Sequence, residues 1–275
     1  MGRRWLWVHV AAVVGTLAIA PSLVTAGSAK RVVSINLCAD QLLVLLADPD
    51  VLRSVTFLSA RPSQSYVADR VDSIPVNHGE AEEILAMQPD LVVAGRFAAR
   101  PAVRMLARLG VPVLDLPIPN TFEEIRRQIA LLSDSLGVQA KGAAMIKKMN
   151  RQLAAVDVPP GPAPRALVLG VRGFTSGPGS LVHEVLTAAG LHNVAGDLGI
   201  GGFGRVDLEE IIAVDPDVIV LNQLADGAPS LAEKVLEHPA LRHFDGKIIR
   251  MNPTLWTCGG PYTVQAVEFL AEAVR

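Results

Sequence analysis

Two cysteines carry the most specific chemistry in the 275-residue chain, because Cys38 and Cys258 are its only thiols. Both lie in loops that follow apolar, strand-like runs, one near each end of the chain. In an oxidising compartment they could form a structural disulfide, which needs Cα atoms within about 7 Å of each other. They could also face a ligand, as soft ligands for a metal centre or as a redox-sensitive gate. A third interpretation is two unrelated buried thiols, and the residues leave all three open.

A second group of side chains suits the binding of a large ligand. Its members are aromatic, cationic or amide residues in loops after apolar runs: Asn36, Tyr66, Arg96, Phe97, Arg172, Phe203, Asn222 and Trp256. Phe174 and Arg205 lie two residues after Arg172 and Phe203 and have the same chemistry. Open parallel sheets bind ligands outside the carboxyl ends of their strands, so we expect these residues and the two cysteines to line a ligand site. Aromatic walls with a few cations suit a large conjugated anion. Trp256 is the only tryptophan after the first thirty residues, and we expect its fluorescence to report binding.

Sequence signatures of catalysis are missing from the chain. It contains no GxSxG, HExxH or P-loop pattern, and His78 has no second ligand at a metal-binding spacing. Residues 199–204 match the dinucleotide glycine pattern in form, but no predicted strand precedes them. We therefore expect no enzyme, no resident metal and no cofactor. The alternative is an enzyme or a protein-interaction module built on the same fold.

The elements that position these loops come from a unit that occurs twice. Residues 82–93 and 209–220 match without a gap, and each copy has two acids, a short helical run, a Pro-Asp pair and a continuous apolar run. Acids favour a helix N-terminus, the proline ends the helix, and an unbroken apolar run is typical of a strand buried in a parallel sheet. The sequence predicts an α/β fold with two similar lobes, each with a parallel-rich central sheet.

A helical segment and a proline-rich break separate the two copies. Residues 121–156 have a helical pattern that starts with a plausible capping box at Thr121 and Glu124. Residues 157–164 contain four prolines and a glycine, which cannot continue a helix. We expect an N-terminal lobe at residues 30–120, connecting helices with one long α-helix at residues 121–158, and a C-terminal lobe at residues 159–275.

The two repeats in register resemble those of type III periplasmic binding proteins, which carry iron-siderophores, haem or cobalamin to ABC importers. The resemblance covers roughly residues 30–275, and it implies two lobes that open little around a bulky metal-containing ligand. Its implied partners are an ABC permease dimer with its ATPase. By resemblance, Glu82 and Glu209 would meet arginines on the two permease subunits, whereas ordinary helix N-terminal charge is the alternative. Tyr66 would match the phenolate that haem carriers of this family often use, and the ligand itself stays unidentified.

The first 29 residues are typical of a secretory signal peptide. Arg3 and Arg4 precede an uncharged run that ends in small residues, so we expect cleavage after Ala26 or Ala29 and a periplasmic location, by the Sec or the Tat route. An uncleaved membrane anchor is the alternative. Without this leader, 23 basic residues stand against 27 acidic ones, a net charge of −4. Such a surface disfavours nucleic acid, and we expect a monomeric carrier.

Overall fold

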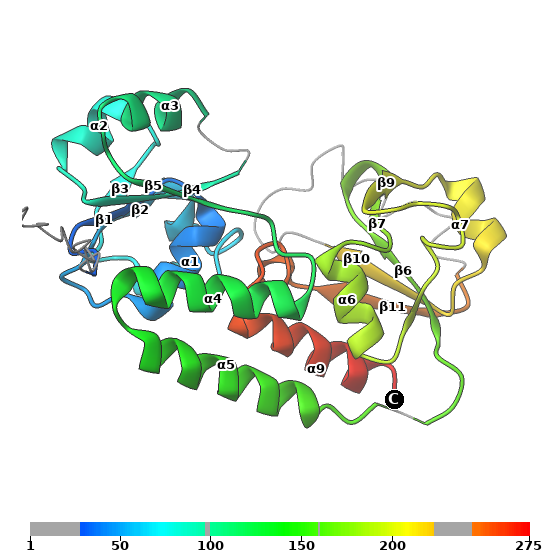
Figure 1. Cartoon of the computed structure of the whole chain (residues 1–275). Coiled ribbons are helices and arrows are strands. Elements are labelled where there is room, and N and C mark those ends of the chain that lie inside the picture. Colours follow the sequence, from blue (N-terminus) through cyan, green and yellow to red (C-terminus); the bar gives the residue numbers. More distant parts are fainter. Residues whose placement is uncertain (1–27, 97–99, 159, 223–243) are drawn as a thin grey trace, which may run out of the picture.

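The computed structural model describes residues 28–96, 100–158, 160–222 and 244–275. Nearly all of the predicted leader lies outside these ranges, as does Phe97. Two α/β lobes lie side by side, with helices α4, α5 and α9 beneath them (Figure 1). No helix in the described ranges is long and apolar enough to cross a membrane.

The first lobe is built on a five-stranded parallel sheet with the order β3-β2-β1-β4-β5. Its strands are β1 (Val32–Ser34), β2 (Leu52–Thr56), β3 (Val76–Asn77), β4 (Leu91–Gly95) and β5 (Val113–Leu116). Helix α1 (Leu37–Leu46) covers one face, and α2 (Ala81–Ala86) and α3 (Arg100–Arg108) cover the other (Figure 1). Because both faces are covered, the central strands are apolar throughout rather than alternating.

The second lobe contains a separate four-stranded parallel sheet with the order β11-β10-β6-β8. Its strands are β6 (Arg165–Leu169), β8 (His192–Asn193), β10 (Val218–Asn222) and β11 (Lys247–Met251). Helices α6 (Leu181–Ala188) and α7 (Leu208–Val214) lie on opposite faces, and β7 (Phe174–Ser176) pairs with β9 (Phe203–Arg205) in an antiparallel ribbon. Two separate parallel sheets confirm the predicted fold class.

The connection between the lobes consists of two helices, α4 (Phe122–Leu136) and the longer α5 (Gln139–Ala154). Thr121 caps α4, since its Oγ1 accepts the backbone N–H of Glu124 at 3.1 Å. The Glu124 carboxylate accepts from the N–H of Asn120, one residue earlier than a capping box requires. Gly137, with φ at 71°, ends α4 and lets α5 pack back against it. The last helix, α9 (Val264–Ala273), packs against α5.

One apolar core runs through both lobes and the helices beneath them. It includes Leu43 of α1, Ile129 of α4, Met149 of α5, Val168 of β6 and Val267 of α9. Smaller cores fill the outer face of each sheet, one against α2 and α3 and the other against α7. Opening the lobes widely would expose the shared core to water, which is unfavourable. The packing therefore favours little movement between the lobes.

The repeated unit has the same backbone in both lobes. Helices α2 and α7 are each followed by a non-glycine residue with positive φ, Gln88 at 48° and Asp215 at 45°. Both residues stand directly before a proline, Pro89 and Pro216. Because a residue before proline is disfavoured in the right-handed helical region, each helix ends there and the strand follows within three residues.

The aspartate of each Pro-Asp pair ties the repeat to the neighbouring strand. Asp90 accepts the backbone N–H of Arg31 at 2.9 Å, and Asp217 accepts that of Arg165 at 2.8 Å. Each arginine also donates from its side chain to a carbonyl near the end of the helix in the repeat. The two lobes thus share the same pair of contacts, one made by the aspartate carboxylate and one made by the arginine side chain.

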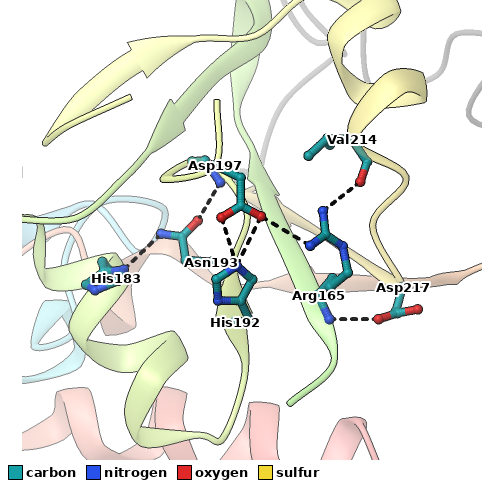
Figure 2. A network of polar contacts seen from close by, with 8 residues as sticks. Arg165, His183, His192, Asn193, Asp197, Val214 and Asp217 are labelled. Carbon is teal, nitrogen blue, oxygen red and sulfur yellow. Dashed lines mark hydrogen bonds and ion pairs between the residues drawn. The ribbon is translucent and has the colours of Figure 1, made fainter. Parts of the chain in front are cut away.

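Figure 2 shows the second of these contacts and the network beside it. Arg165 donates to the carbonyl oxygen of Val214 at 2.9 Å and pairs with Asp197 at 3.2 Å. Asp197 also contacts Nε2 of His192 at 3.0 Å. Arg165 and His192 are the first residues of β6 and β8, so the network lies at the amino ends of these strands. It stabilises the edge of the sheet opposite to the expected ligand site.

Candidate ligand-binding site

A disulfide between Cys38 and Cys258 joins the two lobes, with Cα atoms 5.0 Å apart. Cys38 lies in the first turn of α1, just beyond the carboxyl end of β1, and Cys258 lies in the loop after β11. The carboxyl ends of the two sheets therefore meet at this bond. The sequence left three interpretations open, and the structure agrees with the first of them, a disulfide. The other two are wrong, and neither residue offers a thiol to a ligand.

Asn36 is fixed beside the disulfide as the N-cap of α1. Its Oδ1 accepts the backbone N–H groups of Cys38 and Ala39, both at 3.1 Å. Gly95, at the end of β4, leaves room for this side chain, because a Cβ there would lie 2.4 Å from Nδ2 of Asn36. Asn36 is thus held at the carboxyl edge of the first sheet, where the sequence places it. Its amide oxygen caps α1.

A pocket of about 320 Å³ opens at the carboxyl ends of β6 and β10. Its walls come from β6, the β7–β9 ribbon and the loop after β11: Val168, Gly170, Val171, Phe174, Thr175, Ser176, Phe203, Asn222, Pro253 and Thr257. Phe203 and Phe174 expose 70% and 44% of their surface, so their rings are open to a partner. Exposed aromatic rings beside hydroxyls and an amide suit an organic ligand with many neutral polar groups.

The β7–β9 ribbon holds a cation beside the pocket, on a residue that does not line it. The guanidinium carbon of Arg205 lies 4.6 Å from the ring centroid of Phe174, its partner across the ribbon. Gly173 permits the turn into the ribbon, because φ is 74° and a Cβ would lie against the carbonyl oxygen of Val206. Phe203, predicted from its place in a glycine-rich loop, does lie in this pocket. Phe174 and Arg205 gain their place from strand pairing, which sequence spacing does not reveal.

Trp256 is buried instead of forming an open wall. Only 2% of its surface is exposed, and its Nε1 donates to Oδ1 of Asn222 at 3.0 Å. The loop after β11 turns inward because Asn252 caps the short helix at Pro253–Leu255 and the disulfide anchors Cys258. Trp256 therefore supports Asn222, which lines the pocket, and its ring does not reach a ligand directly.

Tyr66 lies away from this pocket, against the connecting helices. Its ring stacks on Tyr262 with centroids 4.2 Å apart, and its hydroxyl accepts from Nε2 of Gln265 at 2.7 Å. The backbone N–H of Tyr66 donates to the side chain of Gln41 in α1, which pulls the loop toward the helices. The expectation that Tyr66 joins the other candidates in one wall is wrong, because tertiary hydrogen bonds direct its loop elsewhere.

The first lobe instead presents an aromatic stack that the sequence pattern does not predict. Phe57 follows β2 directly and stacks on His78, which follows β3, with centroids 5.1 Å apart. The guanidinium carbon of Arg61 lies 5.0 Å from the centroid of the Phe57 ring. A large aromatic residue directly after an apolar run was the available signal for Phe57. This stack lies at strand carboxyl ends, on the edge where ligands of parallel sheets bind.

A buried carboxyl group holds this part of the first lobe in place. Oδ2 of Asp40 in α1 accepts from Oγ of Ser59 at 2.6 Å and from the backbone N–H of Thr56 at 3.1 Å. Burial raises the pKa of Asp40 from 3.8 to about 6, against the opposing effect of these hydrogen bonds. Asp40 thus links α1 to the segment that carries Phe57, and it contacts no pocket residue.

The two predicted arginines are exposed and lie apart from the pocket in the second lobe. Arg96 directly follows β4, and its backbone N–H donates to the carbonyl of Leu116 at 3.0 Å. Arg172 has a φ of 57°, which is uncommon for a residue with a side chain. It lines a separate hollow of about 290 Å³ together with Glu209. Arg96 stays at the predicted strand end, whereas Arg172 is directed toward α7.

Glu82 and Glu209 occupy equivalent positions in the first turns of α2 and α7, and both are exposed. Their sequence neighbours are used within the fold, since Glu83 and Glu210 each accept a backbone N–H, at 2.8 and 2.9 Å. Among the described residues, Glu82 and Glu209 have no hydrogen-bond or ion-pair partner. Each lobe therefore presents one unpaired carboxylate at the same place in the repeat.

Sequence comparison relates this chain to binding proteins. The model of the periplasmic binding protein family matches residues 32–246. A cobalamin-binding protein of Halobacterium salinarum is 24% identical over 258 residues, which covers 89% of this chain and 69% of the relative. A vitamin B12-binding protein of Salmonella typhi is 31% identical over 162 residues, which covers 56% of this chain and 59% of the relative.

Solved structures share the fold over nearly the whole described chain. The apo form of the periplasmic heme-binding protein RhuT from Roseiflexus sp. RS-1 superposes with a TM-score of 0.73 at 24% identity, covering 90% of this chain and 98% of that one. The periplasmic vitamin B12-binding protein BtuF of Vibrio cholerae gives a TM-score of 0.63 at 22% identity, covering 90% and 96%. Together with the family match over most of its length, the two-lobed fold shows that this chain belongs to the periplasmic binding protein family.

Proposed function

We propose that this chain is the substrate-binding component of an ABC importer and that its ligand is a corrinoid such as cobalamin. The observation that carries the proposal is the neutral, aromatic pocket at the carboxyl ends of β6 and β10. It occurs in a chain that aligns over 89% of its length with a cobalamin-binding protein. A corrin ring bears many amide groups around an apolar macrocycle. Phe174 and Phe203 offer faces to the ring, and Asn222, Ser176 and Thr257 offer hydrogen-bonding groups to the amides.

The first lobe supports the same ligand class. Its stack of Phe57, His78 and Arg61 lies at strand carboxyl ends, as the second-lobe pocket does, and the disulfide holds the two edges together. A corrinoid with a nucleotide loop carries one phosphodiester, which needs a cation such as Arg61 or Arg205. The two aromatic surfaces suit the macrocycle, and the small number of cations suits a ligand with this single phosphodiester charge.

Haem is the second candidate, because the solved structures with this fold include heme-binding proteins. Haem iron needs an axial ligand from the protein, whereas the cobalt of cobalamin brings its own ligands. Both cysteines are in the disulfide, and Tyr66 is held by Gln265 away from the pocket. Among the described residues at the strand ends, His78 offers an exposed imidazole that could bind haem iron, whereas Met251 at the end of β11 is buried. Haem binding here would therefore depend on His78.

The test is calorimetric titration of refolded, ligand-free protein with cyanocobalamin, hemin and ferrichrome. We expect saturable binding of cyanocobalamin at one site, with little heat from the other two. Phe203→Ala should weaken binding about tenfold, because it removes a large apolar contact. Phe269→Ala, which truncates an exposed phenylalanine on α9, serves as the matched control. If the wild-type protein binds hemin and not cyanocobalamin, and His78→Ala loses the hemin binding, the ligand is haem instead.

We further propose that Glu82 and Glu209 dock the protein onto basic residues of the two permease subunits. Their equivalent positions, their exposure and their lack of partners within the described residues support this role. Glu82→Lys combined with Glu209→Lys should abolish transport by the reconstituted importer while leaving ligand affinity unchanged. The charge-matched control is Glu268→Lys with Glu272→Lys on α9. Normal transport by the first pair, or loss of ligand binding, would contradict the docking role.

Export through a cleavable signal peptide is part of this proposal. The backbone N–H of Ala29 donates to the carbonyl oxygen of Ser135 in α4 at 3.0 Å, and Ala29 packs against the shared core. Cleavage after Ala29 would remove these contacts, so we favour cleavage after Ala26. Mass spectrometry of the protein recovered from the periplasm reads the mature N-terminus directly. An intact leader in that fraction would point to the anchored alternative.

A further inference from the structure

A second hollow, of about 370 Å³, lies where the first lobe meets α5 and the start of α9. Its polar lining comes from all three parts: Tyr66, Arg70, Lys148, Gln152, Tyr262 and Gln265. Leucine, alanine, methionine and proline side chains make up the rest of the wall. It shares no lining residue with the pocket at the ends of β6 and β10. The α1 residue that reaches it is Leu45, near the opposite end of the helix from Cys38.

Tyr262 lines this hollow, but its hydroxyl group is buried within the protein and unsatisfied. Tyr262 is 3% exposed, and its hydroxyl oxygen has no hydrogen-bond partner among the described residues. Burial raises the pKa of Tyr262 above its ordinary value, so the hydroxyl keeps its proton and remains a donor. Buried donors are nearly always paired, because leaving one unpaired is unfavourable. The neighbouring Tyr66 does not pair with it and accepts instead from Gln265.

The charged residues that line the hollow have one sign. Arg70 and Lys148 line it, both are exposed, and neither forms an ion pair with a described residue. No aspartate or glutamate belongs to the lining. In a chain with more acidic than basic residues, two unpaired cations beside an acid-free, largely apolar hollow favour a negatively charged occupant.

We propose that this hollow is a binding site for a small aromatic carboxylate, separate from the site for the transported ligand. The ring of such a compound would lie among the methionine and tyrosine side chains, and its carboxylate would face Arg70 and Lys148. The Gln152 amide supplies a neutral donor. Because the walls come from the first lobe, α5 and α9, the occupant bridges the first lobe to the last helix of the second.

Calorimetric titration of the oxidised, full-length mature protein with benzoate tests this site. We expect saturable binding of benzoate and at least about tenfold weaker binding of benzamide, which has the same shape without the charge. Lys148→Met should weaken benzoate binding by a similar factor, whereas Lys147→Met, at an exposed position next in sequence that does not line the hollow, should leave it unchanged.

Tyr262→Phe removes only a buried, unpaired hydroxyl group that the occupant does not contact, so it should leave benzoate binding and the thermal unfolding midpoint unchanged and serves as a second control. The affinity for cyanocobalamin should be unchanged in all three variants, which distinguishes this hollow from the corrinoid pocket. Equal binding of benzoate and benzamide, no saturable binding of benzoate, or unchanged benzoate affinity in Lys148→Met would overturn the proposal.

Discussion

Replacement of the disulfide by two serines tests how the lobes are held together. In the chain-entropy model, a bond between residues 220 positions apart stabilises the folded state by about 5 kcal/mol, because it removes conformations from the unfolded chain. The core shared by the two lobes persists without the bond, so the variant should still fold. We expect Cys38→Ser with Cys258→Ser to lower the free energy of unfolding by up to this amount.

Urea denaturation followed by circular dichroism measures this difference. The midpoint should fall, and the dependence of the free energy on urea should become steeper, because an unlinked chain exposes more surface when it unfolds. Reduced wild-type protein should behave like the double variant. The variant itself should not respond to reductant, which controls for effects of the reagent.

Two results would refute the reasoning. Equal midpoints for oxidised wild type and the double variant would mean that the bond does not restrict the unfolded chain as its long loop implies. Two thiols that titrate in unfolded, unreduced protein would mean that Cys38 and Cys258 are not bonded. In either case, the meeting of the two strand edges would have to rest on the core packing alone.

Two further predictions concern residues beside the disulfide. Asp40 has a folded-state pKa of about 6, above its ordinary 3.8, so its stabilising contribution is present below about pH 4 and is lost as pH rises through 6. Relative to Asp40→Asn, the free energy of unfolding of wild type should therefore fall by up to about 3 kcal/mol between pH 4 and pH 7. Urea denaturation at each pH measures this free energy. The same dependence on pH in wild type and Asp40→Asn would exclude the effect. Gly95→Ala should displace the Asn36 side chain, weaken the cap of α1 and lower the free energy of unfolding by about 1 kcal/mol. The thermal unfolding midpoint should therefore fall. An unchanged midpoint would mean that the cap tolerates the added methyl group.

Local sequence patterns determined the two-lobed fold. Each repeat contains its own helix start, its own proline stop and its own buried strand, so the pattern needs no knowledge of the rest of the chain. The apolar runs at β4 and β10 are continuous because both faces of each sheet are covered. The proline-rich break before β6 marks where the second lobe begins, since prolines cannot continue α5.

Some of the candidate residues lie at the strand ends where the sequence analysis expects them. Asn222 lines the pocket at the ends of β6 and β10, and Asn36 stands at the end of β1. In these cases the side chain lies within one or two residues of a strand or belongs to one. Close to a strand, the backbone direction already fixes which edge of the sheet a residue occupies.

Only the tertiary structure decided the direction of the longer loops and the partners of their side chains. Trp256 is buried because the loop after β11 is anchored by a disulfide to a residue 220 positions away. Tyr66 packs on Tyr262, nearly two hundred residues later in the chain, and so leaves the predicted site. The sequence by itself determined the elements and the edge of each sheet where we expect a ligand, because these follow from local periodicity. Which side chains reach that edge depends on long-range contacts, and no local pattern encodes them.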